Sequence, residues 1–184
     1  MRRPATSLLA LAALVVAGFL AQSAPAESNE VVASASGSGH MIRNGFNRTF
    51  SFTARKYADG TSKGQLDLHS REFDVVVHIE IDCLRVVGNN AHMSGLITFT
   101  SNTDEAFVGE LNRLVVQDNG EGPDSPPDMV SGIPANPGNT NPETCETNTL
   151  VPNRVVQRGN IQFGEPGQHG CASLRASERQ SRRC

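Results

Sequence analysis

A regular alternation of apolar and polar side chains runs through residues 72–120, which read as three consecutive β-strands. Between Val75 and Cys83 the odd-numbered positions are apolar, and from His78 onward the even-numbered positions are polar. Because successive side chains of a strand point to opposite faces, this pattern indicates a sheet with one buried and one solvated face. We therefore predict an antiparallel meander as the centre of the fold.

The turn after this strand decides how it pairs with the strand that follows. A three-residue loop at Gly88-Asn89-Asn90 places Ile81 opposite Ile97, whereas a two-residue turn places Ile81 opposite a polar residue. Register follows the hydrophobic pattern, so we predict the three-residue loop. The same register sets Gly95 opposite Cys83, where a glycine leaves room for a disulfide partner.

Further alternating segments extend the sheet on both sides of the central meander. Phe46–Ala54 and Gly64–His69 are joined by an Asp-Gly turn, and Phe107–Gln117 and Asn153–Phe163 follow later in the chain. We predict an all-β protein, a single antiparallel meander of about six to eight strands that forms a small barrel or a sandwich. The predicted core consists of Phe50, Phe52, Leu66, Val77, Ile79, Ile81, Ile97, Phe99 and Val115.

Residues 1–26 have the organisation of a secretory signal peptide. Arg2 and Arg3 precede a short apolar run from Leu8 to Leu20, and Ala24-Pro25-Ala26 supplies small residues for cleavage. The apolar run is shorter than a membrane-spanning helix requires. We expect a secreted, cell-surface or periplasmic protein with no membrane span after cleavage.

The rest of the chain divides by composition into three parts. Residues 27–45 are small and polar and are expected to form a flexible lead-in. Residues 46–163 form the predicted β-domain, which contains a long loop at 118–148 rich in Gly, Pro, Asn and Asp. Residues 164–184 form a polar tail that we expect to be disordered.

The charge and the aromatic content exclude some classes of partner. The chain has 16 Lys and Arg against 19 Asp and Glu, and cleavage of the signal peptide would remove Arg2 and Arg3. An acidic surface argues against nucleic acid and anionic membranes as partners. With no Trp and 1 Tyr, the chain also lacks an aromatic platform on which bases or sugars could stack.

Four cysteines, at positions 83, 145, 171 and 184, would be exported together into an oxidising compartment. Their number alone allows more than one pairing. We predict a disulfide between Cys83 and Cys145, because both lie in or beside the folded region and the bond would tie the long loop to the core. Cys171 and Cys184 then pair with each other or stay free.

The acidic start of the long loop is a candidate calcium site. Its candidate ligands are Asp118, Glu121, Asp124 and Asp128, which lie among glycines that allow tight folding. Calcium takes oxygen ligands from flexible loops, although this spacing is not that of an EF-hand. The alternative is that these residues cap turns through hydrogen bonds to the backbone and need no metal.

Catalytic motifs are absent from the sequence, so we predict no catalytic and no cofactor-binding residues. There is no Gly-x-Ser-x-Gly, no His-Glu-x-x-His and no phosphate-binding glycine loop. In the preferred register His78 faces Thr100 and His92 faces Val86, so these histidines are not neighbours and do not suggest a zinc site.

Four stretches of the chain resemble a known group of proteins. They are FSFTARKYADGTSKGQLDLHSR, VHIEIDCLRVVGNNAHMSGLIT, VVQDNGEGPDSPPD and RGNIQF, and together they span roughly residues 46 to 163, from Phe50 to Phe163. The chain resembles a family of short secreted bacterial all-β proteins with no established activity. A similar module is found at the C-terminal end of larger surface proteins with immunoglobulin-like domains. The resemblance implies a fold and a compartment but no catalytic or ligand-binding residue.

These observations predict an exported, non-catalytic β-domain that contributes binding or interaction at or outside the cell surface, with a protein or another surface molecule as its partner. One alternative is a carrier of small apolar ligands of the lipocalin kind, which would need an unfilled barrel interior. Another is a calcium-dependent domain that uses residues 118–128. A hydrolase built on the same acidic loop is less favoured, because it would need converging carboxylates.

Overall fold

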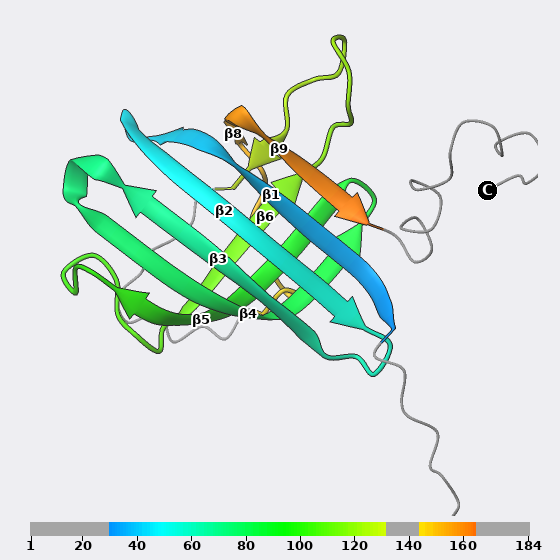
Figure 1. Cartoon of the computed structure of the whole chain (residues 1–184), viewed down its shortest axis with the longest axis horizontal. Coiled ribbons are helices and arrows are strands. Elements are labelled where there is room, and N and C mark those ends of the chain that lie inside the picture. The colour runs from blue at the N-terminus through cyan, green and yellow to red at the C-terminus, as the bar shows by residue number, and fades with distance from the viewer. Residues whose placement is uncertain (1–29, 132–143, 165–184) are drawn as a thin grey trace, which may run out of the picture.

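The computed structural model of the protein describes residues 30–131 and 144–164. Within these residues nine antiparallel strands form one sheet, which curls into a nearly closed barrel (Figure 1). The prediction of an all-β meander is confirmed, although the sheet has more strands than expected. The order of the strands across the sheet is β8-β7-β6-β5-β4-β3-β2-β1-β9. The elements are β1 (Val31–Arg43), β2 (Phe46–Tyr57), β3 (Ser62–Ser70), the 3-10 helix η1 (Arg71–Phe73), β4 (Val75–Val87), β5 (Asn90–Thr100), β6 (Leu111–Gln117), β7 (Met129–Val130), β8 (Arg154–Val155) and β9 (Gln157–Gly164).

The first strand corrects one prediction. Residues 27–45 were expected to be flexible, yet β1 runs from Val31 to Arg43 and pairs with β2 on one side and β9 on the other. Three of its inward positions carry small residues, Ala35, Gly37 and Gly39, so this part of the sequence lacks the alternating large apolar side chains that indicate a strand. A Cβ atom at Gly39 would lie 2.5 Å from the side chain of Val156, so close packing requires the glycine there.

The turn between β4 and β5 also differs from the prediction. Val87 pairs with Asn90, which leaves Gly88 and Asn89 as a two-residue turn rather than a three-residue loop. Gly88 has a φ of 57°, a conformation that glycine adopts without strain. Two-residue turns of this kind match the right-handed twist of the flanking strands.

Two irregularities in the β4–β5 ladder explain why the short turn does not disturb the core. The register shifts between His78 and Ile79 and again between Ile81 and Cys83. A bulge adds an unpaired residue to one strand and so resets which side chains face inward. As a result Ile81 pairs with Gly95 instead of Ile97, and both isoleucines remain buried.

The predicted pairings near the two ends of this hairpin change in the same way. Cys83 lies opposite Ser94, and His92 lies opposite Arg85 rather than Val86. His78 lies opposite Phe99 rather than Thr100.

Most of the side chains predicted to form the core fill the barrel interior, and the two exceptions are Phe99 and Val115. All of the predicted core residues except Phe99 are buried. Phe99 is 47 % exposed because the irregularity beside His78 turns it to the outer face, where its ring lies 5.2 Å from that of His78. Val115 is buried but does not belong to the interior cluster.

The second half of the domain contains shorter and less regular strands. The end of β6 at Leu114-Val115-Val116 is buried on both faces, and Met129-Val130 forms a short strand. The register of β9 against β1 shifts near Arg158, which has a positive φ of 49°. β6 itself begins only at Leu111, so the segment from Phe107 is a connection rather than a strand.

In an antiparallel meander, alternate connections lie at the same end of the sheet. Three of them meet at one end of this barrel: the β1–β2 turn at Asn44-Gly45, the η1 segment and the β5–β6 connection at residues 101–110, on the left in Figure 1. We call this end the barrel mouth.

In the part of the chain that the structure covers, no helix has the length and hydropathy needed to cross a membrane. The predicted signal peptide, most of the predicted tail, and Cys171 and Cys184 lie outside the described residues.

Candidate functional site

Polar residues face the inside of the barrel at its mouth. Met41 of β1, Arg48 of β2, Ser70 of β3 and Val75 of β4 are partners in one row across four neighbouring strands. Side chains of paired residues point to the same face of a sheet, and Met41 and Val75 are buried in the core. The guanidinium of Arg48 and the hydroxyl of Ser70 therefore lie on the inner face.

These residues line a small pocket at the barrel mouth. Its cavity has a volume of about 40 Å³. One water molecule needs roughly 10–15 Å³ by this kind of measure, so the pocket has room for a few waters or a small chemical group. Its apolar lining consists of Met41, Leu68, Phe73, Val75, Val77, Ile97 and Ala106. Its polar lining consists of Arg43, Arg48, His69, Ser70, Glu105 and Asn112.

The pocket is lined by more positively charged than negatively charged side chains. Burial, followed by repulsion from Arg48 and Arg154, lowers the pKa of Arg43, whereas Glu105 raises it. Two guanidinium groups thus line the pocket beside the single carboxylate of Glu105. The guanidinium carbon of Arg48 lies 5.8 Å from the centre of the Phe73 ring, which holds it by a cation–π contact.

Two hydrogen-bond donors of the pocket have no partner among the described residues. They are Nε of Arg48 and Oγ of Ser70, and both are buried. Ser70 is only 4 % exposed. Buried polar groups normally have a partner, because leaving one unsatisfied costs about 1–3 kcal/mol. Both atoms can donate a hydrogen bond, so the pocket is prepared for an acceptor.

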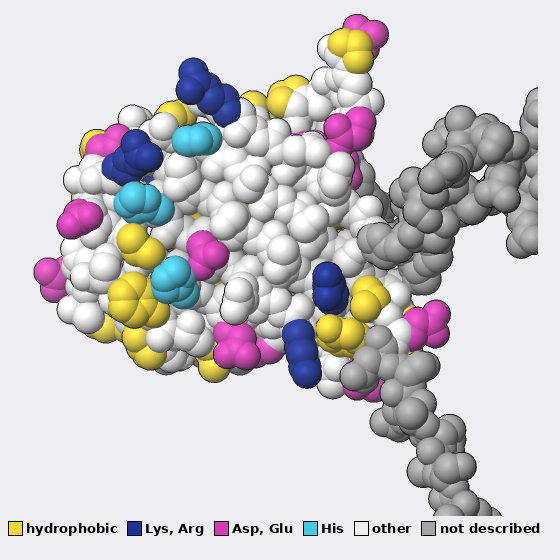
Figure 2. Space-filling view, in the orientation of Figure 1, with side chains coloured by type: hydrophobic (Ala, Val, Ile, Leu, Met, Phe, Trp, Pro, Cys, Tyr) yellow, Lys and Arg dark blue, Asp and Glu magenta, His cyan; other side chains and the backbone are white. Residues whose placement is uncertain are grey.

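Exposed apolar side chains surround the barrel mouth. Phe46 and Phe73 pack edge to face, with ring centres 4.9 Å apart, and both are partly exposed. Figure 2 shows hydrophobic side chains gathered at the same end of the molecule as the β3–β4 and β5–β6 connections. We call this group the apolar rim. It consists of Ile42, Phe46, Phe73, Phe107 and Val108.

The predicted calcium ligands lie along the seam where the barrel closes. Asp128 accepts hydrogen bonds from the amide of Ile161 at 2.7 Å and from the amide of Asn119 at 2.9 Å. Asp118 accepts hydrogen bonds from the amides of Phe163 and Gly120. Ile161 and Phe163 belong to β9, so two aspartate side chains bind the free edge of that strand in place of a neighbouring strand.

The other two predicted calcium ligands, Glu121 and Asp124, differ in their hydrogen bonding and exposure. Glu121 accepts hydrogen bonds from the side chains of Asn160 and Gln162, and these bonds lower its pKa. Asp124 is exposed. Across residues 30–131 and 144–164, the four acidic side chains do not converge on one point. The hydrogen bonds are those of the turn-capping alternative, and calcium binding stays a prediction.

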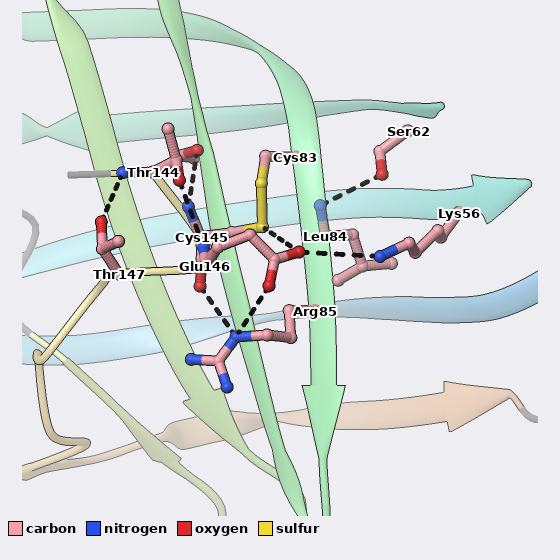
Figure 3. The surroundings of a disulfide bond; sticks show 10 residues. Lys56, Ser62, Cys83, Leu84, Arg85, Thr144, Cys145, Glu146 and Thr147 are labelled. Carbon is pink, nitrogen blue, oxygen red and sulfur yellow. Dashed lines mark hydrogen bonds and ion pairs between the residues drawn. A yellow bond between two sulfur atoms is a disulfide. The ribbon is translucent and has the colours of Figure 1, made fainter. Parts of the chain in front are cut away.

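The structure joins Cys83 to Cys145, the pairing that the sequence favoured. Their Cα atoms are 5.6 Å apart, and Cys145 is fully buried (Figure 3). The backbone of Cys145 is bound on both sides, because its amide donates to Oγ of Ser94 and its carbonyl accepts from Nε of Arg85. Cys83, Cys145 and Glu146 form the only group of potential metal ligands in the described part of the chain, but the disulfide occupies both sulfurs.

His92 lies beside this disulfide region and makes the stability of the fold depend on pH. Burial, followed by the charge of Arg85, lowers its pKa below 6.5. As the pH falls, His92 is therefore protonated at a higher pH in the unfolded chain than in the folded chain. The contribution of His92 to stability is full above pH 6.5 and is lost as the pH falls below that value.

We expect the free energy of unfolding to decrease between about pH 7 and pH 5, and a His92→Gln variant to lose part of that slope. Urea unfolding across this range measures both slopes. A variant with the same slope as the natural protein would contradict the assignment.

Sequence reasoning did not single out the residues of the barrel mouth. One signal for them was present, since Arg48 is in phase with Phe46, Phe50 and Phe52 in β2. A charged residue among inward-facing positions is unusual, because burying a charge is costly unless it has a partner.

Comparisons with known protein families, with curated proteins and with solved structures find no match.

Proposed function

We propose that this protein is an exported, non-catalytic β-barrel domain that acts by binding a partner at or outside the cell surface, and that the barrel mouth is its binding surface. The observation that carries the proposal is the apolar rim around a positively charged pocket. Exposed apolar groups of this kind mark interaction sites in proteins. The signal-like segment at residues 1–26 and the resemblance to secreted proteins support the location.

Binding of a partner accounts for this site better than two of the alternatives, the carrier of apolar ligands and the hydrolase. A carrier of whole apolar ligands needs a cavity of roughly 300–1,000 Å³, whereas the pocket measures about 40 Å³. A hydrolase built on the acidic loop needs carboxylates that are free to meet a substrate. Asp118 and Asp128 instead accept hydrogen bonds from backbone amides.

The proposal is tested by the binding of the labelled mature protein to intact cells of the organism that makes it. Replacing Phe107 and Val108 by serine should weaken saturable binding by at least about tenfold, because the few side chains that anchor an interface cost more than about 1 kcal/mol each when they are truncated. Both side chains are exposed and lie outside the strands, so the fold should tolerate the change.

Val87 provides a matched control for this experiment. It is also an exposed apolar residue, but it adjoins the β4–β5 turn at the opposite end of the barrel. The Val87→Ser variant should bind as the natural protein does. Equal loss in both variants, or no saturable binding at all, would overturn the proposal.

A further inference from the structure

We infer that the pocket at the barrel mouth binds a carboxylate that is attached to a small apolar group. This inference rests on the proposed function and identifies the chemistry that the binding surface recognises. The carboxylate would lie between Arg48 and Ser70, and the apolar group would contact Phe73 and the apolar lining of the pocket.

Hydrogen bonding requires an acceptor at this place. Nε of Arg48 and Oγ of Ser70 are buried without a partner among the residues described, and they belong to paired positions on neighbouring strands. A guanidinium group can only donate hydrogen bonds. A ligand that satisfies it must therefore offer an acceptor lone pair, which an ammonium group or a metal cation lacks.

Charge and size favour a carboxylate over larger anions. Arg43, Arg48 and Glu105 line the pocket. Two positive groups and one negative group leave one positive charge, which a ligand with a single negative charge would neutralise. The volume of about 40 Å³ matches a group of a few atoms. Arginine and carboxylate also match in shape, because two parallel N–H groups can bind the two oxygens.

The surroundings require an apolar group next to the carboxylate. The pocket is lined by the core residues Met41 and Val77 and by the partly buried Leu68, and the Arg48 guanidinium lies over the ring of Phe73. A ligand without an apolar group would leave this lining in contact with water. Removing apolar surface from water contributes roughly 25 cal/mol per Å², so an aliphatic or aromatic carboxylate binds better than formate.

The experiment uses the mature, oxidised protein and calorimetric titration with hexanoate. Hexanoate should bind at least about tenfold more tightly than hexylamine or 1-hexanol, because hydrogen bonds to a charged group contribute about 1.5–3 kcal/mol and 1.4 kcal/mol is a factor of ten. Arg48→Gln should lose this preference, and Ser70→Ala should weaken hexanoate binding several-fold.

Two further variants separate the site from general effects of charge. Arg48→Lys keeps the positive charge but lacks the planar guanidinium, so it should also bind hexanoate more weakly. Arg55→Gln removes an exposed arginine from the same strand and should leave hexanoate binding unchanged. Thermal melts show whether each variant is folded, and Ser70→Ala tests the site even if Arg48→Gln does not fold.

A last comparison identifies the source of the carboxylate. Short peptides that end in leucine with a free carboxyl group should bind if a partner protein supplies it, and the amidated peptides should not. Binding of hexanoate alone would indicate a free small acid. If hexanoate binds no better than hexylamine, the inference is overturned, whereas the loss of cell binding in the Phe107 and Val108 variant would still support the proposed function.

Discussion

Replacing Cys83 and Cys145 by alanine is expected to lower the free energy of unfolding by about 4 kcal/mol. The disulfide joins residues 62 positions apart, so its loss frees a long loop in the unfolded chain. In the folded state it fixes Cys145 to β4, next to Ser94 of β5, whose hydroxyl accepts a hydrogen bond from the buried amide of Cys145. Urea unfolding of the oxidised mature protein and of the double variant measures the difference.

Reduction of the natural protein provides the control for this prediction. A reducing agent should lower the stability of the natural protein to that of the double variant, and it should leave the double variant unchanged. If both proteins unfold at the same urea concentration under oxidising conditions, the bond does not contribute to stability as expected.

Replacing Asp128 by alanine is expected to destabilise the protein by about 3–5 kcal/mol. Asp128 is 7 % exposed, and its carboxylate accepts hydrogen bonds from the amides of Ile161 and Asn119. Removing it leaves the amide of Ile161 buried at the free edge of β9 without an acceptor. The carbonyl of Asp128 also accepts from the amide of Val156, and that backbone bond remains in the variant.

Asp124 serves as the matched control, because it is exposed and belongs to the same loop. Asp124→Asn should change stability by less than about 0.5 kcal/mol. Thermal melts of both variants in EDTA and in calcium also test the predicted calcium site. A ligand that binds only the folded state raises the melting temperature. Equal stability of the Asp128 variant and the natural protein would contradict the role of this residue in closing the barrel.

The central strands were predictable because their signal is local. Each of Val77, Ile79 and Ile81 is buried as its position in the alternation requires, since the faces of a strand follow from its own period of two. The exception was Phe99, which the irregularity beside His78 turns outward. A bulge depends on two strands at once, so the alternation within one strand does not reveal it.

The first strand and the barrel mouth were missed for a related reason. Gly37 and Gly39 of β1 have no side chain to mark them as inward positions in the sequence. They are needed because neighbouring residues of β2 and β9 pack closely against them in the folded barrel. Arg48 and Ser70 are distant in the sequence from the β5–β6 connection, and the curvature of the sheet brings them to one pocket. Arg48 and Ser70 are paired by the register of β2 and β3, and the rest of the pocket depends on that curvature.

Local sequence thus predicted an all-β meander and most of its buried residues, because the side-chain period is a property of short segments. It also favoured a disulfide between Cys83 and Cys145, a bond that joins segments 62 positions apart in the folded chain. The turn at Gly88, the seam through Asp128 and the pocket around Arg48 required the folded barrel. Each of them joins groups from different strands, and the free energy of such contacts depends on geometry that no single segment contains.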